Sequence, residues 1–259
     1  MIPEPPAIEL IDVVSRTEGR TLIDGVSLSL EAGTILGVTG LDGCGKSALL
    51  NLMSTLVPPS AGHVRLFGQD TLAIGIEGRR ALRLQIGTVF EEGGLLEGFT
   101  VEENIELPLA RRGLPREELI RRGEHWIAEL ELTACRDLMP YQLSTSMIRR
   151  AALARALATE PRLLICDEVT TGLDLRAILT FNRMLRRIRD QHGTTIVMAL
   201  DDLVQMSRVA DRVAVLDAGR LVFIGDLARL RDQCREDAVL RTIFDDEVWT
   251  TAFPGAAAP

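Results

Sequence analysis

A glycine-rich segment near the start of the chain has the spacing GxxxxGK[ST], which is typical of loops that cradle phosphates. Its residues are Gly40, Leu41, Asp42, Gly43, Cys44, Gly45, Lys46 and Ser47. Backbone N–H groups in such a loop curl around phosphates, and the helix that starts there adds partial positive charge. We expect Lys46 to reach the β- and γ-phosphates and Ser47 to bind Mg²⁺, with Ala48 beside them. A purely structural turn is disfavoured, because the lysine and the serine both fall in register.

Two carboxylates follow a short apolar run farther along the chain. Residues 163–166 are typical of a buried strand, and Asp167 and Glu168 come directly after them. The carboxyl ends of parallel strands meet at the ligand-binding edge of a doubly wound sheet, so both side chains should lie near the phosphate loop. We expect Asp167 to join the Mg²⁺ shell and Glu168 to polarise an attacking water. A solvated acidic turn is the alternative, and the intact loop weighs against it.

The elements around these groups follow an α/β pattern. Short apolar runs separated by helical segments predict a mainly parallel sheet, with strands at 34–39, 163–166, 195–200 and 213–216. Alternating apolar and polar residues predict antiparallel strands at 8–14 and 26–30. An apolar-periodic helix follows the phosphate loop through Leu56 and stops at Pro58. Residues 100–159 look helical, with breaks at Pro108, Pro115 and Pro140, and form an insertion in the α/β core.

Composition excludes several classes of protein. The 259 residues carry 29 Lys and Arg against 37 Asp and Glu, a net charge of −8 that argues against broad nucleic-acid binding. No apolar run approaches the ~20 residues of a membrane-spanning helix, and the first residues do not resemble a secretion signal, so we expect a cytoplasmic protein. The 4 cysteines and 3 histidines are scattered, which indicates reduced thiols and disfavours a zinc site.

Three further segments make the chain resemble the ATP-binding subunits of ABC transporters over nearly all its length. Residues 100–104 look like the stretch after that family's Q-loop, 138–152 like its signature and following helix, and 170–174 like its D-loop. The Leu-Met-Pro lead-in at 138–140, Met147 and the segment 107–109 most resemble the Mla-type ATPase of bacterial lipid transport. The signature stands at Ser144, Thr145 and Ser146, and Glu91 takes the Q-loop position.

The resemblance implies a fold, a domain plan and partners. We expect a P-loop α/β core with an antiparallel β subdomain over residues 1–90 and 160–236, an inserted helical subdomain over 91–159, and a C-terminal extension over 237–259. Family members bind ATP and Mg²⁺ between two copies, or between one copy and another ATPase subunit, on the cytoplasmic face of the inner membrane. Integral-membrane permease subunits would be the partners, and a small regulatory protein could contact the C-terminal extension.

The chain departs from the family pattern at four places. Thr145 and Ser146 replace the two signature glycines, so Cβ atoms lie where a backbone approaches phosphate. Asp201 stands in place of the switch histidine, and an ionised carboxylate would repel the γ-phosphate; it must therefore turn away, be protonated or penalise the closed ATP state. Glu91 replaces glutamine but remains an oxygen ligand for the metal. No aromatic residue lies near residues 16–21, where the family stacks adenine.

We therefore predict an ATP-binding ABC transporter subunit with weak hydrolysis, in which Glu168 and Asp201 shape turnover and Ser47, Glu91 and Asp167 hold the metal. A degenerate regulatory subunit paired with an active ATPase is the alternative. Soluble ABC proteins of translation or DNA repair usually carry two such domains or a long coiled coil, and neither is present. A small P-loop kinase would not explain the helical insertion.

Overall fold

Two sheets organise the chain, whose computed structural model describes residues 4–244 and Trp249. A four-stranded antiparallel sheet has the order β2-β1-β4-β5, and a six-stranded sheet has the order β10-β9-β3-β8-β7-β6. The strands are β1 (Ile8–Thr17), β2 (Arg20–Leu30), β3 (Ile35–Thr39), β4 (Ala61–Leu66), β5 (Gln69–Asp70), β6 (Ile86–Val89), β7 (Leu163–Cys166), β8 (Thr195–Ala199), β9 (Arg212–Asp217) and β10 (Arg220–Gly225).

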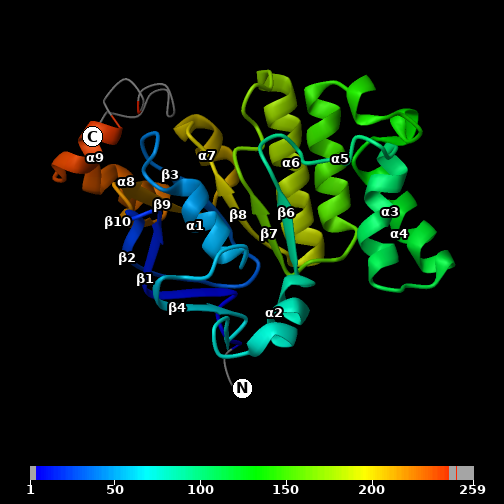
Figure 1. Ribbon diagram of the computed structural model, residues 1–259. Helices are drawn as coiled ribbons and strands as arrows, with labels where there is room; N and C mark the ends of the chain where they lie inside the picture. Colours follow the sequence, from blue (N-terminus) through cyan, green and yellow to red (C-terminus); the bar gives the residue numbers. More distant parts are fainter. Residues whose placement is uncertain (1–3, 245–248, 250–259) are drawn as a thin grey trace.

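The helices surround the larger sheet. They are α1 (Lys46–Met53), α2 (Gly75–Arg83), α3 (Val101–Arg111), α4 (Arg116–Glu129), α5 (Thr145–Leu157), α6 (Leu175–His192), α7 (Leu203–Val209), α8 (Leu227–Cys234) and α9 (Ala238–Ile243), with short 3-10 turns at Thr133–Cys135 and Pro140–Gln142. Figure 1 shows α3, α4 and α5 grouped beyond the β6 edge of the sheet, well away from β1 and β2. Within residues 4–244, no helix combines the length and apolar character that crossing a bilayer requires.

The six-stranded sheet is parallel except at one end. Strands β9, β3, β8, β7 and β6 pair in parallel, whereas β10 returns antiparallel to β9. All five residues of β3 are buried. Leu36 and Val38 belong to the hydrophobic cluster formed with α1 and the antiparallel sheet, whereas Ile35 belongs to the cluster on the opposite face. This arrangement confirms the predicted α/β class with a separate antiparallel sheet and inserted helices, and it brings the loops after β3, β7 and β8 together at one edge.

Pro108 departs from the sequence prediction. It lies inside α3 and does not end it, although Pro115 precedes α4 and Pro140 opens a 3-10 turn as expected. A proline removes one backbone donor, and α3 ends only three residues later, at Arg111, so few helical bonds depend on it. A capping box between Thr100 and Glu103 secures the other end of the helix.

Candidate nucleotide-binding site

The phosphate loop connects the buried strand β3 to the start of α1. Two of its glycines have backbone angles that favour glycine alone, with φ of 146° at Gly40 and 109° at Gly45. A Cβ on Gly45 would lie 2.6 Å from the carbonyl oxygen of Leu22, and one on Gly40 would collide with the carbonyl of Leu216. The loop is therefore a tight cradle that side chains at these positions would fill.

A distant hairpin supports this cradle from below. The backbone N–H of Gly219, in the turn between β9 and β10, donates to the carbonyl of Cys44 at 2.9 Å, and its own carbonyl accepts from Asp24 N at 2.9 Å. Burial raises the pKa of the Cys44 thiol despite the nearby Lys46 charge. Cys44 thus serves as a small buried side chain in a fixed loop.

Lys46 does not point into open solvent. Its Nζ donates to the carbonyl of Gly40 at 3.1 Å and forms an ion pair with Oδ1 of Asp201 at 2.8 Å. Burial alone would lower the pKa of Lys46, but the hydrogen bond and charge of Asp201 outweigh it and raise the pKa. The carboxylate of Asp201, which the sequence resemblance aligns with a switch histidine, therefore turns toward the loop lysine.

Ser47 and the acidic pair lie on the other side of the loop. The Ser47 hydroxyl donates to Oδ1 of Asp167 at 3.2 Å. Burial raises the pKa of Asp167 and is opposed by the Ser47 hydrogen bond, while Glu91 adds to the rise. Burial also raises the pKa of Glu168, and the charge of Asp201 raises it further. Glu168 has φ of 47°, an uncommon angle for a residue with a side chain.

The donor set fits a magnesium nucleotide. A hydroxyl and carboxylates are the oxygen ligands that Mg²⁺ prefers, and the glycine cradle leaves backbone N–H groups for phosphate. Ser47 and Asp167 would hold the ion, with Glu91 close enough to influence Asp167 electrostatically. The Lys46–Asp201 ion pair, the Ser47–Asp167 hydrogen bond and the electrostatic interactions of Glu168 connect these five side chains. The five predicted groups therefore lie in one site.

The signature residues lie elsewhere. Ser144 caps α5 by accepting from Met147 N at 3.4 Å, and its hydroxyl lies 3.3 Å from that of Ser146. Thr145 is exposed beside them. Within residues 4–244, no hydrogen bond or ion pair that the structure shows joins these three side chains to the phosphate loop. A single chain therefore does not bring its signature residues to its own phosphate loop. This agrees with the expectation from the sequence resemblance that the nucleotide binds between two subunits.

A buried polar network links the loops after β7 and β8 and was not predicted from the sequence. The Gln205 amide on α7 donates to Thr170 Oγ1 at 2.9 Å and to Asn182 Oδ1 at 3.3 Å. Thr170 follows Glu168 by two residues, and Gln205 follows Asp201 by four. A buried glutamine in a short apolar helix is the sequence signal that could have revealed it.

A second unpredicted contact holds the segment after Glu91. Arg155 on α5 donates from Nη1 to the carbonyl of Gly94 at 2.6 Å and from Nη2 to that of Gly93 at 3.1 Å. Arg149, one turn and a half earlier on α5, is buried, and its Nε has no partner among the described residues. Helix α5 thus holds the segment after the predicted Q-loop position through the hydrogen bonds of Arg155, which lies on the same helix as the buried Arg149.

Comparisons with known proteins agree with this geometry. Residues 23–171 match the sequence profile described as ABC transporter. The methionine import ATP-binding protein MetN of Caulobacter vibrioides is 39% identical over 237 residues, which cover 92% of this chain and 71% of that protein. MetN of Xylella fastidiosa is 40% identical over 205 residues, covering 79% of this chain but 61% of the relative. The chain therefore spans about two thirds of the length of these relatives.

Solved structures share the fold. The ATP-binding cassette MJ0796, in a dimeric post-hydrolysis state with ADP and phosphate, aligns with a TM-score of 0.78 and 26% identity, covering 85% of this chain and 98% of that one. CbiO1 of Clostridium perfringens, part of a cbiONQ transporter complex, aligns with a TM-score of 0.81 and 24% identity, covering 93% of this chain and 95% of that one. The latter likeness concerns the fold alone.

Proposed function

Because the chain belongs to the ABC transporter family, we propose that it is an ATP-binding subunit that couples nucleotide binding to the movement of membrane permease subunits. The observation that carries this proposal is the meeting of Lys46, Ser47, Asp167 and Glu168 around one glycine cradle. A lysine, a hydroxyl and two carboxylates at the end of a parallel sheet are the groups that phosphoryl transfer to water requires. The proposed location is the cytoplasmic face of the inner membrane.

Each side chain has a chemical task in this scheme. Lys46 would bind terminal phosphate oxygens, while Ser47 and Asp167 orient a magnesium ion that neutralises phosphate charge. Glu168 would hold a water for in-line attack, and the burial that raises its pKa makes it a stronger proton acceptor than an exposed carboxylate. The network of Thr170 and Gln205 would keep Glu168 and Asp201 at a fixed separation.

The signature supports a site completed by a second subunit. Ser144 and Thr145 are exposed at the N-terminus of α5, free to approach a phosphate loop on another copy or on a related ATPase subunit. The hydroxyls of Thr145 and Ser146 would have to replace the backbone contacts that glycines permit. We infer that turnover is therefore slow, and a regulatory subunit paired with an active ATPase is the second candidate, favoured by the pairing of Asp201 with Lys46.

Relatives guide the proposal about cargo. The MetN proteins named above are methionine import proteins, and we propose an import system whose first cargo to test is methionine. The expectation of a lipid cargo rests on short strings such as residues 107–109, and neither of these relatives names a lipid. Co-purification of the complete transporter, followed by mass spectrometry of bound molecules, decides between an amino acid and a lipid.

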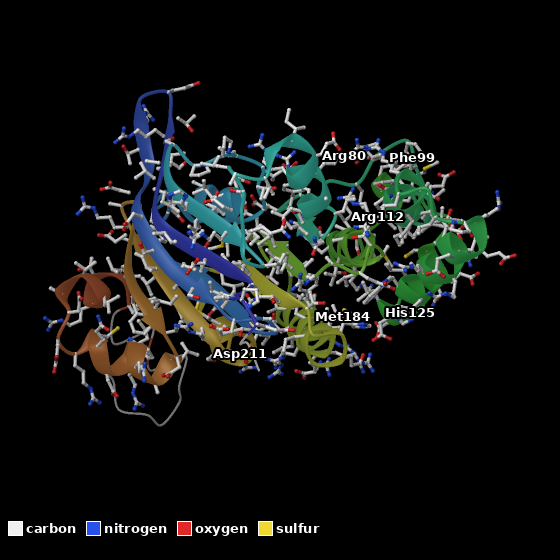
Figure 2. The ribbon with its side chains drawn as sticks, turned by 90° about the horizontal axis from the view of Figure 1, so that it is seen from below. Arg80, Phe99, Arg112, His125, Met184 and Asp211 are labelled. Carbon is white, nitrogen blue, oxygen red and sulfur yellow. The ribbon has the colours of Figure 1, made fainter. Side chains whose placement is uncertain are left out.

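A basic groove supports a docking place for the membrane partner. A cavity of about 380 Å³ lies between α2, β6, α3 and α5, and none of the described residues that line it is a carboxylate. Its basic lining residues are Arg80, Arg83, Arg111, Arg112 and Arg155. Figure 2 shows Arg80 and Arg112 near one another on the side of the molecule seen from below. We propose that an acidic segment of a permease subunit docks here, because its carboxylates would complement this charge.

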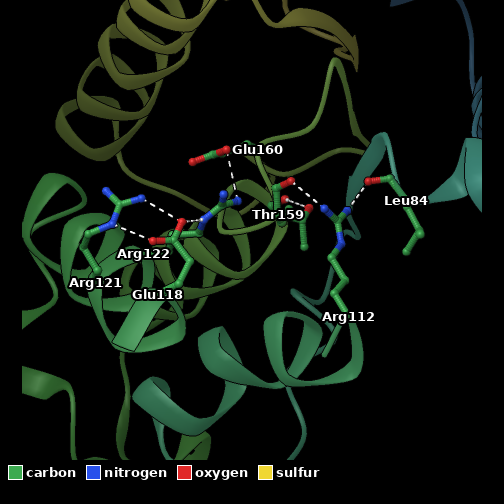
Figure 3. Close-up of polar contacts among 8 residues, drawn as sticks. Leu84, Arg112, Glu118, Arg121, Arg122, Thr159 and Glu160 are labelled. Carbon is green, nitrogen blue, oxygen red and sulfur yellow. Dashed lines mark hydrogen bonds and ion pairs between the residues drawn. The ribbon is translucent and has the colours of Figure 1, made fainter. Parts of the chain in front are cut away.

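Three arginines of this groove, Arg83, Arg112 and Arg155, donate hydrogen bonds to neutral oxygens. Arg112 donates to the carbonyls of Leu84 and Thr159, while the neighbouring Glu118 and Glu160 pair with Arg121 and Arg122 (Figure 3). Burial lowers the pKa of Arg112 and the charge of Arg122 lowers it further, while the charge of Glu160 only partly opposes this fall. A partner that supplies carboxylates would therefore stabilise the groove electrostatically.

The function is tested by nucleotide titration of the purified chain. Wild-type protein should bind magnesium ATP, and Lys46→Ala should lose the binding while keeping its thermal unfolding temperature within a few degrees. Arg65→Ala, in the antiparallel sheet, is the matched control and should bind like the wild type. A wild-type chain that binds no nucleotide, or a Lys46→Ala variant that binds normally, would overturn the proposal.

A further inference from the structure

The contact between Lys46 and Asp201 bears on which nucleotide the site prefers. The two side chains form an ion pair at 2.8 Å, in which the lysine side chain is 6% exposed and the aspartate side chain 53%. An ammonium group donates three hydrogen bonds, and two of them already go to Asp201 and to the carbonyl of Gly40. The carboxylate therefore occupies a position on Lys46 that a phosphate oxygen would otherwise take.

The backbone holds Asp201 at this position. Strand β8 lies beside β3 in the sheet, and the N–H of Leu200 donates to the carbonyl of Val38 at 2.9 Å. On its other side, Asp202 caps α7 by accepting from Val204 N at 2.7 Å and Gln205 N at 3.2 Å. Asp201 is thus fixed between a strand end and a capped helix, while its half-exposed side chain can still rotate toward solvent.

We propose that Asp201 is a specificity-determining residue: its carboxylate competes with the terminal phosphate for Lys46 and so reduces the preference of the site for triphosphates over diphosphates. The inference rests on the proposed ATP site. Phosphate binding requires the carboxylate to leave Lys46, and the displaced charge remains next to the phosphates because its backbone is held. A triphosphate carries more negative charge into this region than a diphosphate, so it is opposed more strongly.

The surrounding charges strengthen this effect. Asp167, Glu168 and Glu91 also bring carboxylates to the site. Burial is the main cause of the raised pKa of Glu168, and the charge of Asp201 raises that pKa further. Lys46 is the cation that acts on Glu168, Asp167 and Cys44 alike. With one lysine shared among several carboxylates, each additional phosphate charge meets repulsion that Lys46 alone does not cancel.

The test compares Asp201→Asn with Asp202→Asn in the chain of 259 residues. Both substitutions remove one negative charge from the same loop, and asparagine also serves as an N-cap, so α7 remains capped in the control. Isothermal titration would measure ADP and a non-hydrolysable ATP analogue with Mg²⁺. We expect Asp201→Asn to tighten the analogue by roughly tenfold and ADP by less than about threefold, and Asp202→Asn to change neither by more than about twofold.

Three results would overturn the inference while leaving the proposed ATP site in place. An Asp201→Asn variant that binds the analogue no better than the wild type would show that the carboxylate does not compete. If Asp201→Asn tightened ADP and the analogue equally, Asp201 would have no role in nucleotide specificity. If both variants had equal effects, the change in affinity would come from the net charge of the loop and not from Asp201 itself. If neither the wild type nor either variant binds nucleotide, the proposed ATP site fails as well, which separates that failure from the others.

Discussion

Ser47 Oγ donates to Oδ1 of Asp167 at 3.2 Å, which joins residues that lie 120 positions apart in the chain. The pair links the first turn of α1 to the loop after β7 and presents oxygens suited to Mg²⁺. We expect Ser47→Ala to weaken nucleotide binding by roughly tenfold when Mg²⁺ is present and by far less when the metal is chelated. Titrations with and without EDTA measure this difference.

The control for that experiment lies on the same helix. Ser54 ends α1, and its hydroxyl donates to the carbonyl of Asn51 far from the phosphate loop. Ser54→Ala should leave the magnesium dependence unchanged. An equal loss of affinity with and without Mg²⁺ in Ser47→Ala would assign the hydroxyl to phosphate or to loop structure instead.

Glu168 is expected to control hydrolysis without controlling binding. Glu168→Gln keeps the shape of the side chain but removes the proton acceptor, so steady-state ATPase activity of the transporter should fall by roughly 10²-fold or more. Nucleotide affinity should change little, because Lys46 and Ser47 remain. Glu236→Gln, on an exposed surface after α8, serves as the control. A rate that survives Glu168→Gln would give the base role to another group.

The signature substitutions are expected to limit turnover in the assembled transporter. Replacing Thr145 and Ser146 by glycine should raise ATPase activity, because the backbone of α5 could then approach phosphate more closely. The isolated chain should bind nucleotide as before. Glycine in the first turn of α5 should cost about 1 kcal/mol per residue in helix stability, and thermal unfolding would detect this cost. An unchanged or lower rate would show that the hydroxyls already serve as donors.

Charge reversal in the basic groove is expected to weaken the membrane partner. Arg80→Glu and Arg111→Glu place carboxylates in a groove proposed to bind an acidic segment, so the yield of permease in pull-downs should fall several-fold, most at low salt. Arg116→Glu, an exposed change on α4 outside that lining, is the control. Equal retention of permease by all three variants would rule out the groove as the docking site.

Asn104 is expected to matter for stability. It is fully buried on α3; its amide donates to the carbonyls of Leu96, Phe99 and Thr100, and its side-chain oxygen accepts from Leu96 N at 2.8 Å. Asn104→Ala leaves these groups buried without partners and should lower the free energy of unfolding by about 1–3 kcal/mol. Urea denaturation measures this against Asn51→Ala, a less buried position on α1. A loss no larger than that of the control would mean that water replaces the amide.

The sequence predicted which residues form the candidate site better than it predicted where helices and strands end. The order of strands and helices placed Asp167 and Glu168 near the phosphate loop, because strand ends in a parallel sheet share one edge. The predicted helix after the loop ended at Leu56, but α1 stops at Met53, and Thr55 has a φ of 60° before the prolines are reached. Asp12, with φ of 46°, likewise accompanies a register shift in β1 that no alternation pattern announces.

Side-chain partners were harder to predict. That Asp201 could meet a phosphate followed from the family pattern, but its pairing with Lys46 depends on the neighbouring positions of β3 and β8. Arg155 reaches Gly94 across 61 positions and Gly93 across 62, which no local pattern encodes. Residues 245–248 and 250–259 of the C-terminal extension, which the resemblance implies as a contact for a small regulatory protein, lie outside the described residues.

The contact of Gly219 with Cys44 affects when the phosphate loop can fold during synthesis of the protein. The phosphate loop is made early in translation, yet the turn on which it rests is encoded some 175 positions later, as is the carbonyl of Leu216 that closes on Gly40. A nascent chain on the ribosome that has not yet formed this hairpin contains the glycine motif but lacks the hairpin contacts that hold it. The cradle is therefore completed only when most of the polypeptide has emerged, which delays nucleotide capture until the surrounding fold is in place.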